Sequence, residues 1–201
     1  LDKLKVALSA RQKGLNKMLA RFTVATLVLL GTSISNLTYA EKADQDKPII
    51  LEAEKVSGND TSQVYDLNGE VLLVKGSIIV TGEEGHIRID PEGYEFIDVK
   101  GTPEAVATFR QRREGLANEF MQGRGSNATY DAKTEILTLT GDASLKRLLN
   151  MQILDQLYGW KIEYDDVKQY YRVIPPNDAK PDDLPKARAV LTPRRKALVE
   201  K

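Results

Sequence analysis

The sequence predicts an all-β fold of the sandwich, jelly-roll or barrel kind, and two observations carry that prediction. The first is a weak internal repeat, in which residues 69–90 are echoed by residues 141–146 and 159–165. Each copy has a run of β-forming residues, a glycine-marked turn and a second run that ends on an acidic residue. The second observation is that β-type runs recur at intervals of about eight to twelve residues, without helical patterns between them.

The segment from residue 49 to residue 90 supplies the first group of expected strands, at residues 49–56, 63–67, 70–75, 77–81 and 86–90. In the last of these, Ile87 and Ile89 alternate with polar residues, so one face is buried and the other meets water. Residues 71–74 and 78–80 are instead apolar at successive positions. One face of each run should pack within the sheet, and the other should meet a partner, a second sheet or a ligand.

The rest of the chain supplies expected strands at residues 96–100, 105–110, 126–130, 135–140, 160–164 and 170–174, separated by turn residues. Residues 143–157 are ambiguous, because Leu145, Leu148 and Ile153 also suit one face of a helix. The match between this segment and the first copy of the repeat favours a strand and a turn.

The N-terminal segment has the form of a secretory signal peptide. Lys17 and Arg21 flank Met18, an apolar stretch begins at Phe22, and residues 38–40 offer the small side chains of a cleavage site. We therefore expect cleavage before residue 41 and export of the mature protein. A membrane anchor is the alternative, but about 20 apolar residues are needed to span a bilayer, and polar residues interrupt the run at 31–36.

The domain organisation follows from this segment. Residues 1–17 precede the signal-peptide pattern and contain no methionine, so we expect translation to start at Met18 and residues 1–17 to be absent from the native precursor. The signal peptide is expected at 18–40 and a single β-domain at 41–193, with a proline-rich linker at 175–186 and a basic tail at 194–201. About 160 residues are enough for one domain with a core and too few for two.

Composition and motifs narrow the function. The chain has 29 basic and 29 acidic residues and no cysteine, so it offers neither the positive field that nucleic acid attracts nor a disulfide framework. His86 is its one histidine, and it has no serine-hydrolase, zinc-protease or phosphate-loop motif. We expect no catalytic residue, no cofactor and no metal. The basic groups at 110–113 and 194–196 either meet phosphate or carboxylate groups or are solvated loop and tail charges.

Five segments carry a family resemblance: residues 48–54, 69–80, 101–109, 130–131 and 137–141. In that order they resemble the LptA/OstA family, the periplasmic proteins of lipopolysaccharide export in Gram-negative bacteria. The resemblance spans residues 47–193 and includes the signal peptide ahead of them. It implies an open, twisted antiparallel β-jellyroll in the periplasm, whose apolar interior carries lipopolysaccharide acyl chains. Burial of such chains is worth about 0.8 kcal/mol per methylene, so transport needs no bond chemistry.

The resemblance also implies lipid-binding positions. It places Ile49 and Leu51 at one end of the groove, Phe109 in its interior and Tyr130 towards the other end. Alternation along the strands adds lining candidates, although a register slip of one residue would exchange the two faces. These candidates are Leu72, Val74, Ile78, Val80, Ile87 and Ile89.

The partners implied by the resemblance are lipopolysaccharide, through its lipid A acyl chains, and the inner-membrane and outer-membrane Lpt jellyroll proteins. Residues 187–191 resemble the family's last strand, and unpaired first and last strands are templates for strand addition. Contacts of that head-to-tail kind between copies give open filaments. No nucleic-acid partner is expected. Two alternatives stay open: a ligand-free periplasmic β-scaffold or adaptor, and the membrane-anchored inner Lpt component.

Overall fold

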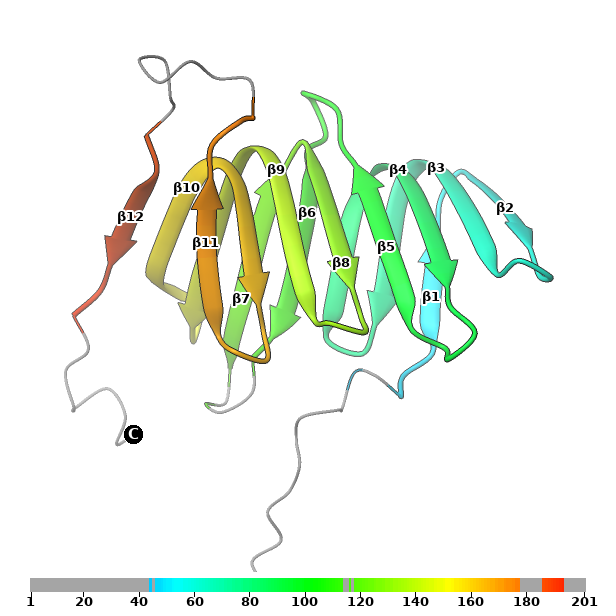
Figure 1. Ribbon diagram of the computed structural model, residues 1–201, viewed down its shortest axis with the longest axis horizontal. Helices are drawn as coiled ribbons and strands as arrows, with labels where there is room; N and C mark the ends of the chain where they lie inside the picture. Colours follow the sequence, from blue (N-terminus) through cyan, green and yellow to red (C-terminus); the bar gives the residue numbers. More distant parts are fainter. Residues whose placement is uncertain (1–43, 45, 114–115, 117, 178–185, 194–201) are drawn as a thin grey trace, which may run out of the picture. The chain divides into compact units, whose positions relative to one another are not determined.

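The computed structural model describes residues 44, 46–113, 116, 118–177 and 186–193. These residues form twelve β-strands and no helix, and every strand pair is antiparallel (Figure 1). No helix long and apolar enough to cross a membrane occurs in this described part. The strands are β1 (Ile49–Glu52), β2 (Lys55–Asn59), β3 (Val64–Lys75), β4 (Ile78–Ile89), β5 (Glu95–Lys100), β6 (Ala107–Arg112), β7 (Glu119–Gly125), β8 (Asn127–Asp131), β9 (Ile136–Leu149), β10 (Gln152–Asp165), β11 (Tyr170–Ile174) and β12 (Arg188–Leu191).

The sheet folds over on itself into two walls, because four long strands change partners along their length. β4, for example, pairs with β5 through residues 84–89 and with β6 through residues 79–81. The first wall contains β2, residues 64–68 of β3, residues 84–89 of β4, β5, β8, residues 136–140 of β9, residues 161–165 of β10, and β11. The second wall contains β1, residues 72–75 of β3, residues 78–82 of β4, β6, β7, residues 144–149 of β9, residues 152–158 of β10, and β12.

The long strands bend where they pass from one wall to the other, and the bends form a corner along the upper side of Figure 1. Gly69 and Glu70 in β3, and Gly141 and Asp142 in β9, all have positive φ angles and interrupt the strand register. Glycine tolerates that conformation without steric cost, and such two-residue bulges bend a strand. The predicted repeat is therefore confirmed as two long hairpins, β3–β4 and β9–β10, that are bent at equivalent glycines.

Several predicted strand bounds need correction. Residues 49–56 are two strands, because β1 pairs with the second-wall part of β3 and β2 with its first-wall part. The ambiguous segment 143–157 is strand and turn, as expected. β7 was missed, since a segment with glycines at 123 and 125 has little strand propensity. Gly123 faces across the interior, where an added Cβ would lie 2.4 Å from the Leu139 side chain, so close approach of the walls explains this glycine.

The expected all-β class and antiparallel jellyroll are confirmed. The predicted linker is described only at its two ends, and the last strand, β12, pairs with residues 155–158 of β10. The predicted signal peptide at 18–40, the absence of residues 1–17 from the precursor and the basic tail at 194–201 lie outside the described residues.

Candidate functional site

The space between the two walls is the candidate functional site. Both walls direct alternate side chains inward, and most of the inward ones are apolar and buried. The largest of those that are fully buried are Phe109, Leu73, Ile87, Ile97, Leu137, Leu139, Leu145 and Ile162. Phe109 from the second wall and Tyr130 from the first wall meet here, with ring centroids 5.6 Å apart. Side chains therefore fill the middle of this interior.

Eight of the ten predicted lipid-binding residues lie on the inward face. Five of them are buried in the core: Ile78, Val80, Ile87, Phe109 and Tyr130. Ile49 and Leu51 are half-buried against the core on the edge strand β1. Ile89 ends β4 on the same face as Ile87 and is half-buried. The structure thus brings these residues together, while contact with lipid stays a prediction for all of them.

Leu72 and Val74 are the exceptions, and the prediction that they line the interior is wrong. Along β3 the buried positions are Val71, Leu73 and Lys75, so Leu72 and Val74 are half-buried on the outer face. Four successive apolar residues fit either register, and the sequence alone could not choose between them. The buried positions of β3 keep one alternation from Leu67 to Lys75, and the pairing of this part of β3 with β1 and β4 fixes which face is inward.

A cavity opens at the end of the interior that lies beside β11 and β12. Its volume is about 590 Å³. Apolar side chains from five strands line one part of it, and charged side chains line another part. The apolar residues are Met121, Leu145, Leu157, Tyr171 and Leu191, and the charged ones are Arg113, Glu119, Arg147 and Asp155. This cavity was not expected, since much of its lining comes from the missed strand β7 and from the ambiguous segment 143–157.

The four charged residues form one network in which each charge has an opposite partner. Arg113 Nη1 lies 2.5 Å from Glu119 Oε1, and Arg147 Nη1 lies 3.4 Å from the same oxygen. Arg147 also donates to Asp155 Oδ2 from Nε at 2.8 Å and from Nη2 at 2.6 Å. Because two guanidinium groups balance two carboxylates, this network is not a net positive site for an anion.

Polar side chains also face each other across the side opposite the corner. Lys75 Nζ, at the end of β3, lies 2.6 Å from both carboxylate oxygens of Glu95, at the start of β5. Both side chains are more than nine-tenths buried. Sequence patterns could not reveal this pair, since charged residues at alternating strand positions are normally taken as outward-facing.

Two tyrosines contribute to the same side. Burial raises the pKa of the Tyr130 hydroxyl, nearby carboxylates including Glu135 raise it further, and a hydrogen bond with Gln111 opposes the rise. Burial likewise raises the pKa of Tyr164, which donates to Asp166 Oδ1 at 2.8 Å, while the nearby Arg113 opposes the rise. Both hydroxyls therefore stay protonated at neutral pH.

The outer face of the first wall is polar. His86 Nδ1 lies 2.7 Å from Asp66 Oδ1, and both side chains are largely exposed. Glu163 accepts from Arg172 Nε at 2.6 Å and lies 2.8 Å from Lys161 Nζ. Burial raises the pKa of Glu163, but these hydrogen bonds and charges together bring it below its usual value. Within the described ranges, no cluster of three or more His, Cys, Asp or Glu side chains could hold a metal ion.

Comparison with known proteins agrees with this architecture. Residues 51–170 match the model of a family described as LptA/(LptD N-terminal domain) LPS transport protein. The chain is 29% identical over 149 residues to the lipopolysaccharide export system protein LptA of Haemophilus influenzae, which covers 73% of this chain and 78% of that protein. The crystal structure of LptH from Pseudomonas aeruginosa, described as the LptA homologous periplasmic component of its lipopolysaccharide transport device, superposes with a TM-score of 0.63. That match has 20% identity and covers 75% of this chain and 99% of the other.

The last of these matches shows a shared fold, and the family model covers more than half of the chain. Strands β2 to β10, with the corner and most of the inward side chains, lie within the matched residues. This chain belongs to the LptA/(LptD N-terminal domain) LPS transport protein family.

Proposed function

We propose that this protein carries lipopolysaccharide across the periplasm by holding its acyl chains between the two walls. The observation that supports this most directly is the apolar inward face. It runs from the half-buried Ile49 and Leu51 at one end to the cavity lined by Leu145 and Leu157 at the other. Each methylene moved from water to such surroundings gains about 0.8 kcal/mol. The family is named for transport, and binding of this kind needs no catalytic group.

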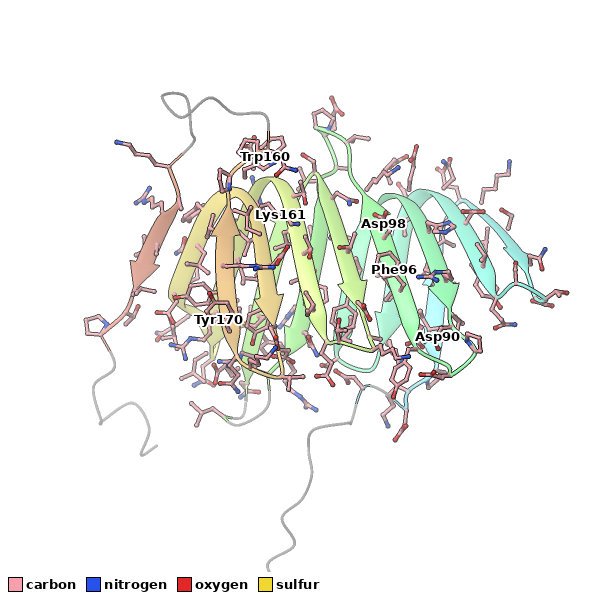
Figure 2. All side chains as sticks on the ribbon, viewed as in Figure 1. Asp90, Phe96, Asp98, Trp160, Lys161 and Tyr170 are labelled. Atoms are coloured by element: carbon pink, nitrogen blue, oxygen red, sulfur yellow. The ribbon has the colours of Figure 1, made fainter. Side chains whose placement is uncertain are left out.

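The strand edges support head-to-tail assembly with other jellyrolls. β1 and β2 are edge strands at one end of the sheet, and β11 and β12 are edge strands at the other. Backbone groups on such edges pair readily with another strand. Exposed apolar side chains also gather at the β11 and β12 end, where Trp160 lies at the corner and Tyr170 begins β11 (Figure 2). Partners at these edges would be further copies of this chain and the inner-membrane and outer-membrane Lpt jellyrolls.

Delivery to the periplasm would follow from cleavage of the predicted signal peptide before residue 41. Mass spectrometry of the mature N-terminus tests this part of the proposal by itself. A mature chain beginning at Glu41 is the expected result, and a chain that retains residues 18–40 would favour the membrane-anchored alternative.

Site-specific photo-crosslinking in living cells tests the groove itself. A photoreactive residue at Leu51, which faces inward, should give an adduct that contains lipopolysaccharide. The matched control is Ile50, which neighbours Leu51 on β1 but faces outward and is 51% exposed. Both positions lie on the same edge strand, so lipid that approaches this edge can reach both. They differ in that Leu51 faces the interior and Ile50 faces outward.

The two positions together decide between the proposal and its main rival. Crosslinking at Leu51 and not at Ile50 supports the lipid groove. Equal crosslinking at both indicates contact along an edge rather than binding inside. If neither Leu51 nor the cavity residue Leu157 yields an adduct in folded protein, the ligand-free scaffold is the better account, and the filled interior around Phe109 and Tyr130 would then be a permanent core.

A further inference from the structure

The two walls are held together differently along their two sides. At the corner, the backbone of the described residues passes from one wall to the other through the bent strands and the short connections at residues 53–54, 101–106 and 126. On the opposite side, each turn joins neighbouring strands of the same wall, as residues 76–77 join β3 to β4 and residues 90–94 join β4 to β5. Among the residues that the structure describes, the walls meet there only through side chains.

Three pairs of described side chains face each other across this side, and we call these pairs the seam. Lys75 of the second wall pairs with Glu95 of the first at 2.6 Å. Further along, Gln111 lies near Tyr130 and Arg113 lies near Tyr164, close enough to influence the pKa of each tyrosine. In each pair one partner comes from the second wall and the other from the first. All three pairs are polar, although the interior immediately behind them is apolar.

We propose that the seam is a gate between the walls and that the buried Lys75–Glu95 ion pair is its latch. This inference rests on the proposed lipid groove. Phe109, Tyr130 and their neighbours fill the middle of the interior, so acyl chains can lie there only if the walls move apart. Because the backbone links the walls at the corner, the parting runs through the seam.

An ion pair suits a contact that must open repeatedly. When apolar side chains separate, both surfaces meet water at a cost that grows with their area. When Lys75 and Glu95 separate, each charge regains the hydration that it lost on burial, which offsets much of the lost attraction. A buried ion pair therefore holds the two walls together in one alignment when no lipid is bound, yet it opposes their opening less than an apolar pair of similar size. Once parted, the two charges lie beside the opening through which a polar headgroup would extend.

The test replaces the latch with an apolar contact of similar size, Lys75→Met together with Glu95→Leu. Such replacements of buried ion pairs are commonly neutral or stabilising, so this variant should fold. It should bind purified lipopolysaccharide about tenfold more slowly than wild type in stopped-flow fluorescence, because opening now exposes apolar surface. The matched control, Lys75→Glu together with Glu95→Lys, keeps an ion pair with its charges exchanged and should bind at a rate close to that of wild type.

A distance measurement observes the opening directly. The chain has no cysteine, so spin labels can be attached at Thr134→Cys, in the turn after β8 on the first wall, and Met151→Cys, in the turn before β10 on the second. Both positions are exposed. Double electron–electron resonance should report a longer distance between the labels when lipopolysaccharide is added to wild type. In the apolar variant, fewer molecules should show that longer distance at the same short time after lipopolysaccharide is added.

The outcomes separate the two proposals. If wild type does not bind lipopolysaccharide, both the groove and the latch are wrong. If wild type binds it, but the apolar variant binds as quickly and the distance between the labels does not change, the groove stands and the latch is wrong. Slow binding by the charge-exchanged control as well as by the apolar variant would also overturn the latch, since it would show that the side chains matter for something other than their pairing.

Discussion

Phe109 should contribute more to the stability of the jellyroll than any aromatic residue on the outer face. Its side chain is 1% exposed and meets Tyr130 from the opposite wall at 5.6 Å between ring centroids. Truncation of a fully buried phenylalanine to alanine costs about 3–5 kcal/mol, because transfer free energy is lost and a cavity remains. The aromatic contact accounts for about 0.5–1.5 kcal/mol of that loss. For Phe109→Ala we therefore expect unfolding free energy to fall by about 4 kcal/mol.

Urea unfolding followed by circular dichroism measures this change, and a thermal melt should shift downward by about 8–16 °C for a domain of this size. Phe96→Ala is the matched control. Phe96 lies on the outer face of β5, half-buried, with the Arg88 guanidinium carbon 5.7 Å from its ring centroid, and its loss should cost about 1 kcal/mol. If the two variants lose equal stability, or Phe109→Ala loses less than the control, the assignment of Phe109 to the packed interior is refuted.

Three further predictions concern the corner, the outer face and the end of the sheet. Gly141→Ala should lower the unfolding free energy by about 1–2 kcal/mol, since the φ angle of Gly141 is +77° and the new Cβ would meet Ser126. Gly93→Ala is the control in the same urea assay: its φ angle is +92°, but no atom lies within 4 Å of the new Cβ, so it should cost less. Glu163→Gln should destabilise the protein at pH values above the pKa that Glu163 has in the unfolded chain, because a carboxyl whose pKa is lowered on folding stabilises the folded state there. The difference in stability between wild type and variant should disappear as the pH falls through the pKa of Glu163 in the folded protein. A difference that persists in acid would contradict the assignment of this stabilisation to the ionised carboxylate. Val167→Asp, at a side chain 69% exposed beside β11, should leave stability unchanged and weaken self-association in light scattering if that edge is the assembly surface.

Much of the fold could be predicted because β-strands leave a local signature. Alternation at Ile87 and Ile89 follows from the two-residue period of a strand, and the structure has both residues on one face. The repeat was visible because each long hairpin needs a glycine at its bend, and both glycines have the positive φ angle that this bend requires. β7 was not visible, because its glycines are selected by the nearness of the opposite wall, which is a tertiary contact.

The candidate site was predicted less completely. Residues such as Phe109 and Tyr130 were found through the family resemblance, and the structure brings them into contact. Leu72 and Val74 were assigned to the wrong face, since no local pattern fixes the register of an uninterrupted apolar run. Inward-facing charges such as Lys75 and Glu95 were missed, because their burial depends on a partner 20 residues away in sequence.

The sequence by itself determined the all-β class, the repeated hairpin and the family, because these depend on residue periods, turn formers and segment order within the chain. Only the tertiary structure decided which face of each apolar run points inward, where the four long strands change partners, and how the walls meet along the seam. The physical reason is the range of the interactions. Strand propensity and turns are local, whereas register, bulges and buried ion pairs are fixed by groups that are distant in sequence and come together only when the two walls close.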